Sequence, residues 1–298
     1  MSMFQGMCAF PLTPMNETSL DEAAFGRLVD RLAVAGVDSI GALGSTGSYA
    51  YLSLPERRRI VRLAVEHAGG IPVMVGIGAL RLRDVLQAAE DAQSVGASAV
   101  LLAPVSYQAL TPDDVWGLYE AVSASLSVPL CVYDNPHTTR FLFSDELHGR
   151  ISRLPNVASI KIPAVPGDSE AARRRVDALR SVIAPGVGIG VSGDASAIAG
   201  LVAGCDAWYS VIGGLFPEPA LALTRAAASG DVEGASRLSE EFASLWAMFQ
   251  RYGSLRVVAA AAEILGLAKT PCLPLPLRAI EGEAREALAG VLRTLDLA

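Results

Sequence analysis

The chain has 298 residues, of which 51% are hydrophobic and 18% are charged. This length supports a large buried core and lies near the upper limit for a single one, so one barrel and two smaller domains both fit. The formal net charge of −7 disfavours nucleic acid and anionic membranes as partners, because both of them attract basic proteins.

The N-terminal residues 1–10 have no basic leader, and no stretch approaches about eighteen uninterrupted apolar residues, so we expect a cytoplasmic protein. The cysteines are far apart in the sequence, and no histidine lies at short spacing from another histidine or a cysteine. The sequence therefore predicts no disulfide framework, no metal site and no cofactor.

Short apolar runs alternate with helical patterns as far as about residue 230. The eight runs that we predict as strands are residues 6–10, 39–43, 72–75, 99–103, 129–133, 158–162, 187–191 and 207–212. They are nearly continuous in apolar residues, which is typical of parallel strands covered by helices. Eight strand–helix units indicate an α/β fold, a closed (β/α)8 TIM barrel, and not a doubly wound sheet, which usually has fewer strands.

Chemical signals mark the ends of several predicted helices. Residues 53–56 (S-L-P-E) and 19–22 (S-L-D-E) fit capping boxes, and residues 111–114 add a proline at the first helical position. Two arginine runs, 57–59 and 173–175, fall within expected helices, and we predict that they are solvated helix faces.

The strand pattern stops after about residue 230. Residues 232–252, 254–266 and a segment from about 278 have helical patterns, and no flexible linker separates them from the rest. We therefore predict a barrel in residues 1–230 and a helical C-terminal extension in residues 231–298, packed on the barrel as a single structural unit.

Lys161 lies between isoleucines near the end of the sixth predicted strand. In such barrels the active site lies at the C-terminal ends of the strands, and desolvation there favours the neutral, nucleophilic amine of a lysine. A lysine that is paired with a carboxylate at the barrel rim is the structural alternative, and the residue alone does not decide between the two.

Tyr133 ends the fifth predicted strand, which is the barrel neighbour of the sixth. A phenol both gives and accepts a proton, which suits the carbinolamine and imine steps of lysine chemistry. A tyrosine at a strand end is more often a packed ring, so the adjacency to Lys161 is what favours a catalytic role.

A glycine-rich turn, residues 41–48 (G-A-L-G-S-T-G-S), follows the second predicted strand. Its backbone N–H groups and the hydroxyls of Ser45 and Thr46 can hold a substrate carboxylate. It lacks the G-x-G-x-x-G order and the lysine of a P-loop, so phosphate binding has little support. A tight strand-to-helix connection explains the glycines equally well.

Together these motifs resemble the dihydrodipicolinate synthase and N-acetylneuraminate lyase family of class I aldolases and lyases. The resemblance runs over essentially the whole chain. Three segments resemble family motifs: residues 44–48 (G-S-T-G-S) resemble the family's G-T-T-G-E, residues 133–136 (Y-D-N-P) its Y-N-x-P, and residues 160–161 (I-K) its I-K-E. The other matching segments are residues 11–14 (P-L-T-P), 192–194 (S-G-D) and 213–214 (G-G).

The resemblance implies a role for five residues of this chain. Lys161 would form a Schiff base, Tyr133 would donate and accept protons, and Ser45 would occupy the position of a proton-relay threonine. Thr46 would bind the carboxylate of a 2-oxo acid, and Tyr209 matches the position whose backbone lines the 2-oxo acid pocket. The family is usually homotetrameric, so the resemblance implies a homotetramer here.

Several departures from the family pattern concern the second substrate. The family's P-Y-Y becomes P-V-S-Y, so Ser106 replaces the relay tyrosine and Tyr107 comes one place late. The synthases carry an arginine two residues after the Y-N-x-P proline, where this chain has Thr138, with Arg140 further on. Thr138 and Arg140 are therefore the candidate contacts of the second substrate, and residues 162–163 (I-P) replace the glutamate and small residue after the lysine.

The sequence thus predicts a Schiff-base-forming carbon–carbon lyase or aldolase that acts on pyruvate or a related 2-oxo acid together with an aldehyde. One alternative is a 2-oxo acid dehydratase or hydratase-aldolase that uses the same lysine imine. Another, from a different class, is a protein that binds 2-oxo acids without turning them over.

Overall fold

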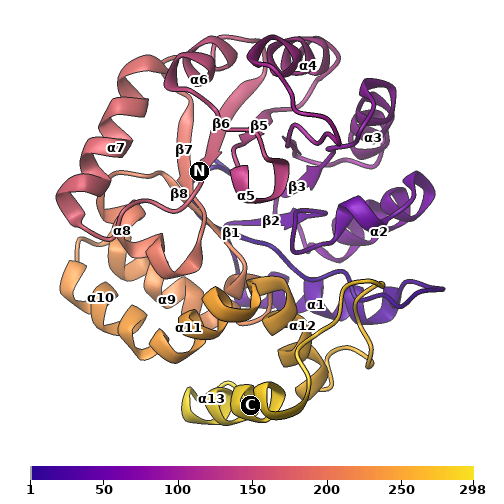
Figure 1. The fold of residues 1–298 in the computed structure, drawn as a ribbon, viewed down its shortest axis with the longest axis vertical. Helices are drawn as coiled ribbons and strands as arrows, with labels where there is room; N and C mark the ends of the chain where they lie inside the picture. The colour runs from indigo at the N-terminus through magenta and orange to yellow at the C-terminus, as the bar shows by residue number, and fades with distance from the viewer. Residues whose placement is uncertain (1) are drawn as a thin grey trace.

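Eight parallel strands close into a barrel in which each strand is hydrogen-bonded to its neighbours in sequence and β1 pairs with β8 (Figure 1). The structure is a computed structural model and describes residues 2–298. The strands are β1 (Gly6–Ala9), β2 (Ser39–Ala42), β3 (Val73–Gly76), β4 (Ala99–Leu102), β5 (Leu130–Tyr133), β6 (Val157–Ile162), β7 (Gly188–Val191) and β8 (Ala207–Ser210). The predicted (β/α)8 barrel is confirmed, and every strand overlaps its predicted run.

Helices follow the strands and form a ring around the barrel (Figure 1). They are α1 (Glu22–Ala35), α2 (Leu54–His67), α3 (Leu82–Ser94), α4 (Pro112–Ala124), α6 (Asp145–Ile151), α7 (Ser169–Val182), α8 (Ala197–Val202) and α9 (Pro217–Ala228). Four shorter helices lie at the ends of strands, namely α5 (Pro136–Thr139) and the 3₁₀ turns η1 (Tyr49–Tyr51), η2 (Asp194–Ser196) and η3 (Ile212–Gly214).

Two of the predicted helix starts are present, and one is wrong. Ser53 begins α2 and Thr111 begins α4, each through reciprocal hydrogen bonds with an acidic residue three positions later. In α1, however, Asp21 and not Ser19 is the cap, and its carboxylate accepts a backbone N–H of the first turn at 3.0 Å. The backbone N–H of Ser19 instead donates to the side chain of Asn16 at 2.9 Å, which holds Ser19 in the preceding turn.

The prediction of a solvated face for residues 57–59 is wrong for Arg57, which is only 6% exposed. Its guanidinium donates to the carbonyl oxygens of Gly76 at 3.0 Å and of Gly78 at 3.1 Å, and it lies over the ring of Tyr49. The two arginines that follow are half exposed. Arg57 thus ties α2 to the C-terminal end of β3, next to the glycine-rich turn.

Side chains of the strands alternate between two apolar clusters, one inside the barrel and one between strands and helices. In β5, Leu130 and Val132 face the helices, whereas Cys131 and Tyr133 face the interior. In β6, Ile160 faces the helices, so the same alternation turns Lys161 inward. The period of two therefore sends both predicted catalytic side chains into the barrel.

The C-terminal part of the chain is helical, as predicted. Its helices are α10 (Val232–Glu241), α11 (Ala243–Tyr252), α12 (Ser254–Ile264) and α13 (Gly282–Thr294). The single helix predicted for residues 232–252 is interrupted at Phe242, whose side chain is buried. Buried residues of all four helices belong to the outer cluster of the barrel, and α10 packs against α8 and α9. The boundary at residue 230 stays a prediction. Among residues 2–298 no helix is both long and apolar enough to cross a membrane.

Candidate active site

Lys161 lies at the C-terminal end of β6 with its amine inside the barrel, and only 5% of the residue is exposed. Its direct partner in the neighbouring strand is Tyr133 of β5. The lysine Nζ lies 4.1 Å from the ring centroid of Phe10, 4.5 Å from that of Tyr133 and 5.3 Å from that of Tyr209. The structure thus brings together a buried lysine and two phenols.

The alternative role for Lys161, an ion pair at the rim, does not fit this arrangement. The chain has two lysines, Lys161 and Lys269. Of these two, only Lys269 forms an ion pair among residues 2–298, with Asp21 at 3.9 Å. The Lys269 side chain is 88% exposed. Lys161 therefore differs from the ordinary surface lysine of this protein both in burial and in having aromatic neighbours in place of a carboxylate.

The hydroxyl of Tyr133 lies between two polar side chains. Ser45 Oγ is 3.1 Å from the phenol oxygen, and Asn135 Nδ2 donates to the same oxygen at 2.7 Å. Ser45 comes from the loop after β2, whereas Asn135 directly follows β5. The structure thus joins the predicted proton donor and the predicted relay residue, and it adds Asn135, which the sequence motifs did not single out.

The glycines of the predicted anion-binding turn make room for an aromatic ring. A Cβ atom at Gly41 or Gly44 would overlap the ring of Phe10, and neither glycine has a positive φ. The left-handed residues of this turn are instead Leu43, with a φ of 56°, and Ser48, with a φ of 52°. Two of the three glycines of this turn are therefore explained by the close approach of Phe10, the ring nearest to the lysine amine.

The side chain of Tyr209 lies in the barrel interior. Its hydroxyl is 2.7 Å from Ser159 Oγ and 3.4 Å from Cys131 Sγ, all within the closed interior. Burial raises the pKa of Tyr209 well above its usual value. Its ring thus lies beside Lys161, and its hydroxyl is engaged by Ser159 and Cys131.

The end of β8 is fixed by a buried acid. Asp194, in the turn after β7, accepts the backbone N–H groups of Val211 and Ile212 and the indole N–H of Trp208, at 2.7 to 3.1 Å. Burial raises the pKa of the Asp194 carboxyl to about 6, although its hydrogen bonds favour the charged form. This carboxyl holds the chain on either side of the Tyr209 backbone in place.

The other predicted substrate contacts occupy two segments. Thr46 is buried in the loop next to Ser45. Thr138 is exposed on α5, its hydroxyl donates to the carbonyl of Asn135 at 3.4 Å, and Arg140, also exposed, ends α5 in a left-handed conformation. The substrate-binding roles predicted for Thr46, Thr138 and Arg140 stay predictions.

A model described as the Dihydrodipicolinate synthetase family matches residues 3–295. The chain belongs to this family. A 4-hydroxy-tetrahydrodipicolinate synthase of Anaplasma marginale (strain Florida) is 30% identical over 283 residues, which cover 95% of this chain and 91% of that protein. The predicted family and the prediction of an enzyme of that family are confirmed.

Solved structures of the dihydrodipicolinate synthetase family have the same fold. The dihydrodipicolinate synthase of Agrobacterium tumefaciens has 43% sequence identity and a TM-score of 0.94, with 98% of both chains covered. The chloride-inhibited dihydrodipicolinate synthase of Acinetobacter baumannii, complexed with pyruvate, has 26% identity and a TM-score of 0.89, with 99% of this chain and 100% of that chain covered.

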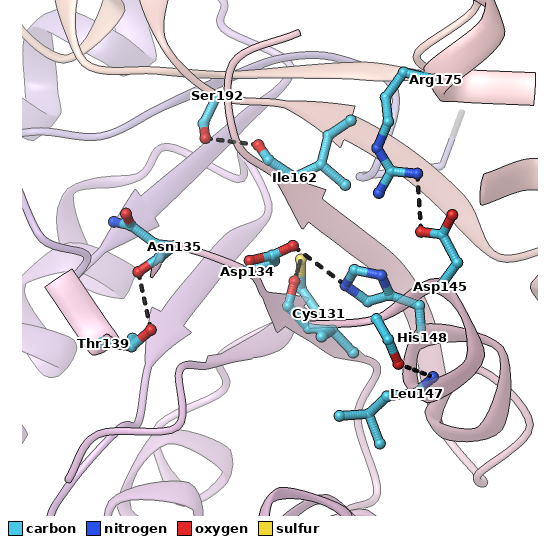
Figure 2. Close-up of polar contacts among 12 residues, drawn as sticks. Cys131, Asp134, Asn135, Thr139, Asp145, Leu147, His148, Ile162, Arg175 and Ser192 are labelled. Carbon is cyan, nitrogen blue, oxygen red and sulfur yellow. Dashed lines mark hydrogen bonds and ion pairs between the residues drawn. The ribbon is translucent and has the colours of Figure 1, made fainter. Parts of the chain in front are cut away.

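Between β5 and α6 lies a pair of residues that our sequence analysis missed. Asp134 stands where the motif of the dihydrodipicolinate synthetase family has asparagine, and its backbone N–H donates to the carbonyl of Lys161 at 3.0 Å. Figure 2 shows its carboxylate pointing at the ring of His148 on α6, with Oδ2 and Nε2 3.4 Å apart and both side chains buried. Burial raises the pKa of Asp134 to about 7 and lowers that of His148 to about 4.

The residues that we missed share one property, which is that no local pattern marks them. Phe10 looks like the last apolar residue of a strand, and His148 looks like a polar residue of a helix. The single available signal was Asp134, because it departs from the asparagine of the Y-N-x-P motif.

Proposed function

We propose that this protein is a Schiff-base-forming lyase in which Lys161 attacks the ketone carbon of pyruvate or a related 2-oxo acid. The observation that carries the proposal is the buried Lys161 amine, which has three aromatic rings around it, forms no ion pair among the described residues and is paired in register with Tyr133. The names of the relatives support the reaction class, and the pyruvate bound to the Acinetobacter baumannii enzyme supports the substrate.

In the first step the amine nitrogen of Lys161 adds to the carbonyl carbon, and a proton passes from this nitrogen to the carbonyl oxygen, which becomes the hydroxyl of a carbinolamine. The substrate carboxylate is held by the hydroxyl of Thr46 and by backbone N–H groups of the turn after β2. This assignment of Thr46 is part of the proposal. It places the negative end of the substrate at the wall opposite β6.

In the second step the carbinolamine loses water. Tyr133 gives its proton to the departing hydroxyl, and the resulting phenolate regains a proton through Ser45, which lies 3.1 Å away. The imine then loses a proton from the carbon next to it, and the enamine that forms adds to the carbonyl carbon of an aldehyde, whose oxygen takes up a proton to become a hydroxyl. Hydrolysis of the imine returns the free lysine, and the same steps in reverse cleave a longer 2-oxo acid.

The second substrate is expected near Thr138 and Arg140 on the segment after β5. A dehydratase or hydratase-aldolase that uses the same imine is the alternative outcome, because these positions differ from the family's dicarboxylate site. Incubation with a panel of 2-oxo acids separates cleavage from dehydration, since aldol cleavage releases pyruvate and an aldehyde whereas dehydration releases water and leaves the carbon chain intact. A homotetramer and a cytoplasmic location remain predictions.

The test is reduction of the enzyme–pyruvate mixture with borohydride followed by peptide mass analysis. Since the chain has two lysines, the adduct has few possible positions. We expect one reduced pyruvate on the peptide that contains Lys161, and none after Lys161→Arg. The matched control, Lys269→Arg, keeps the adduct. Pyruvate binding without any adduct on Lys161 would contradict the proposal and favour a binding protein.

A further inference from the structure

We propose that Asn135 is a positioning residue that orients the hydroxyl of Tyr133, so that the phenol exchanges its proton only with Ser45 and with the substrate. The inference rests on the proposed lysine-imine reaction. It goes beyond that reaction because it assigns a role to a side chain outside the set Lys161, Tyr133 and Ser45.

The first observation is the pair of neighbours of the Tyr133 hydroxyl. Asn135 Nδ2 lies 2.7 Å from the phenol oxygen and Ser45 Oγ lies 3.1 Å from it. An amide nitrogen only donates, whereas a serine hydroxyl both donates and accepts. Asn135 therefore occupies one acceptor direction of the phenol oxygen and cannot receive its proton. The proton of Tyr133 is left with Ser45 or with a bound substrate as its partner.

The second observation is that the Asn135 backbone is held firmly. Its carbonyl accepts the hydroxyl of Thr139 at 2.9 Å and the backbone N–H of Thr139 at 3.0 Å, and Thr139 is itself buried. Figure 2 shows the Thr139 hydroxyl directed at this carbonyl. Pro136 follows and restricts the backbone further. The amide is thus placed against Tyr133 before any substrate arrives, as preorganised catalysis requires.

The third observation is what the Asn135 side chain does not do. Asn135 precedes α5 at a position where asparagine commonly accepts a backbone N–H of the first turn, yet its side chain makes no such hydrogen bond. The side chain is instead turned to the phenol. A purely local role as a helix cap therefore does not explain this asparagine.

The hydrogen bond from Asn135 affects the step in which the carbinolamine loses water. When Tyr133 gives its proton to the departing hydroxyl, its oxygen becomes negative, and the amide N–H of Asn135 then donates to a charged acceptor. Hydrogen bonds to charged groups are worth more than neutral ones, so the loss of this donor slows imine formation by roughly 10- to 100-fold. Binding of the 2-oxo acid is made by other groups and changes little.

The experiment compares four variants with the parent protein by rapid-quench borohydride trapping with pyruvate. Asn135→Leu removes the donor in a similar volume, and Asn135→Asp keeps the shape but replaces the donor by an acceptor. His137→Gln on the same short helix is the control for disturbance of α5, because His137 is exposed. Asn135→Gln restores a donor, which allows partial rescue and serves if Asn135→Leu does not fold.

We expect trapping to slow by roughly 10- to 100-fold in Asn135→Leu with the pyruvate concentration for half-maximal rate nearly unchanged. Asn135→Asp is expected to be slower still, because its carboxylate competes for the phenol proton. Trapping at the parent rate in Asn135→Leu, or a faster rate in Asn135→Asp than in Asn135→Leu, overturns the inference. No adduct in the parent overturns the proposed function itself, so the two failures are distinct.

Discussion

Asp134 and His148 face each other between β5 and α6, with carboxylate Oδ2 and imidazole Nε2 3.4 Å apart and neither side chain exposed (Figure 2). Burial penalises charge on both, which raises the pKa of Asp134 to about 7 and lowers that of His148 to about 4. Between these values the folded pair carries its proton on the carboxyl. In the unfolded chain, where the usual pKa values are 3.8 and 6.5, the imidazole carries it.

Other charges near this pair are already paired with each other. Arg175 of α7 donates to Asp145 of α6 at 2.8 Å, and both lie close enough to act on Asp134 and His148 in opposite directions. The ring of Phe143 stacks on the imidazole at 4.9 Å. The opposing effects of Arg175 and Asp145 largely cancel, so burial dominates and favours the uncharged forms of Asp134 and His148.

The first prediction concerns the pH dependence of stability. Folding moves one proton from His148 to Asp134 without changing their number, so the pair adds almost no slope between about pH 4.5 and 6. In Asp134→Asn only the imidazole remains, and since the unfolded chain then binds the proton more readily, stability falls as pH drops from 6.5 towards 4. The loss is roughly 3 kcal/mol over the full window.

The reverse variant has the opposite slope. In His148→Gln only the raised carboxyl remains, and because the folded form now binds the proton more readily, stability falls as pH rises from about 4 towards 7. Melting temperatures of the parent and both variants between pH 4.5 and 7.5 test this. Parallel curves for all three proteins would mean that the two groups do not exchange a proton on folding.

The barrel and its two central residues were readable from the sequence because each depends on a periodic pattern. Eight apolar runs predict eight strands, and neighbouring strands bring Lys161 next to Tyr133 whatever the helices do. Asn135 and the pair of Asp134 and His148 could not be located in this way. Asn135 donates to the hydroxyl of Tyr133, and Asp134 faces His148 of α6. Both residues follow the end of β5, where the period of two stops, so tertiary packing decides where their side chains point.

Arg57 is a further residue whose environment the sequence pattern did not indicate. Three consecutive arginines in a helix indicate a solvated face, yet a helix turns by about 100° per residue, so the three point in different directions. One of them reaches the carbonyl oxygens at the end of β3. Charge patterning describes the run as a whole and does not identify the member that is buried.

The second prediction follows from the fork geometry of Arg57. Lysine at position 57 cannot reach the carbonyl oxygens of both Gly76 and Gly78 with a planar pair of donors, and its ammonium is more strongly hydrated. We expect Arg57→Lys to destabilise the protein by roughly 2 to 3 kcal/mol. The matched control is Arg58→Lys, because Arg58 is half exposed. In a calorimetric scan this variant is expected to have the melting temperature of the parent. Equal melting of both variants would contradict this role.

The third prediction concerns the space reserved for Phe10. In Gly44→Ala the new Cβ overlaps the Phe10 ring, which must turn away from the lysine amine. We expect a loss of roughly 1 to 3 kcal/mol and slower adduct formation. Because the clash needs both residues, Phe10→Leu in the same chain should recover part of the lost stability. Gly117→Ala in α4, where a Cβ meets open space, serves as the control and should be neutral or stabilising.

The fourth prediction separates the roles of Tyr133 and Tyr209, whose ring centroids lie 4.5 Å and 5.3 Å from the Lys161 Nζ. Tyr133→Phe removes the hydroxyl that reaches Ser45, so we expect borohydride trapping to slow by about 10² to 10⁴ with little change in melting temperature. Tyr209→Phe removes a buried hydrogen bond to Ser159 and is expected to cost about 1 kcal/mol of stability with a much smaller effect on the rate. If Tyr209→Phe were the slower of the two variants, proton transfer would run through the barrel interior and not through the relay at its mouth.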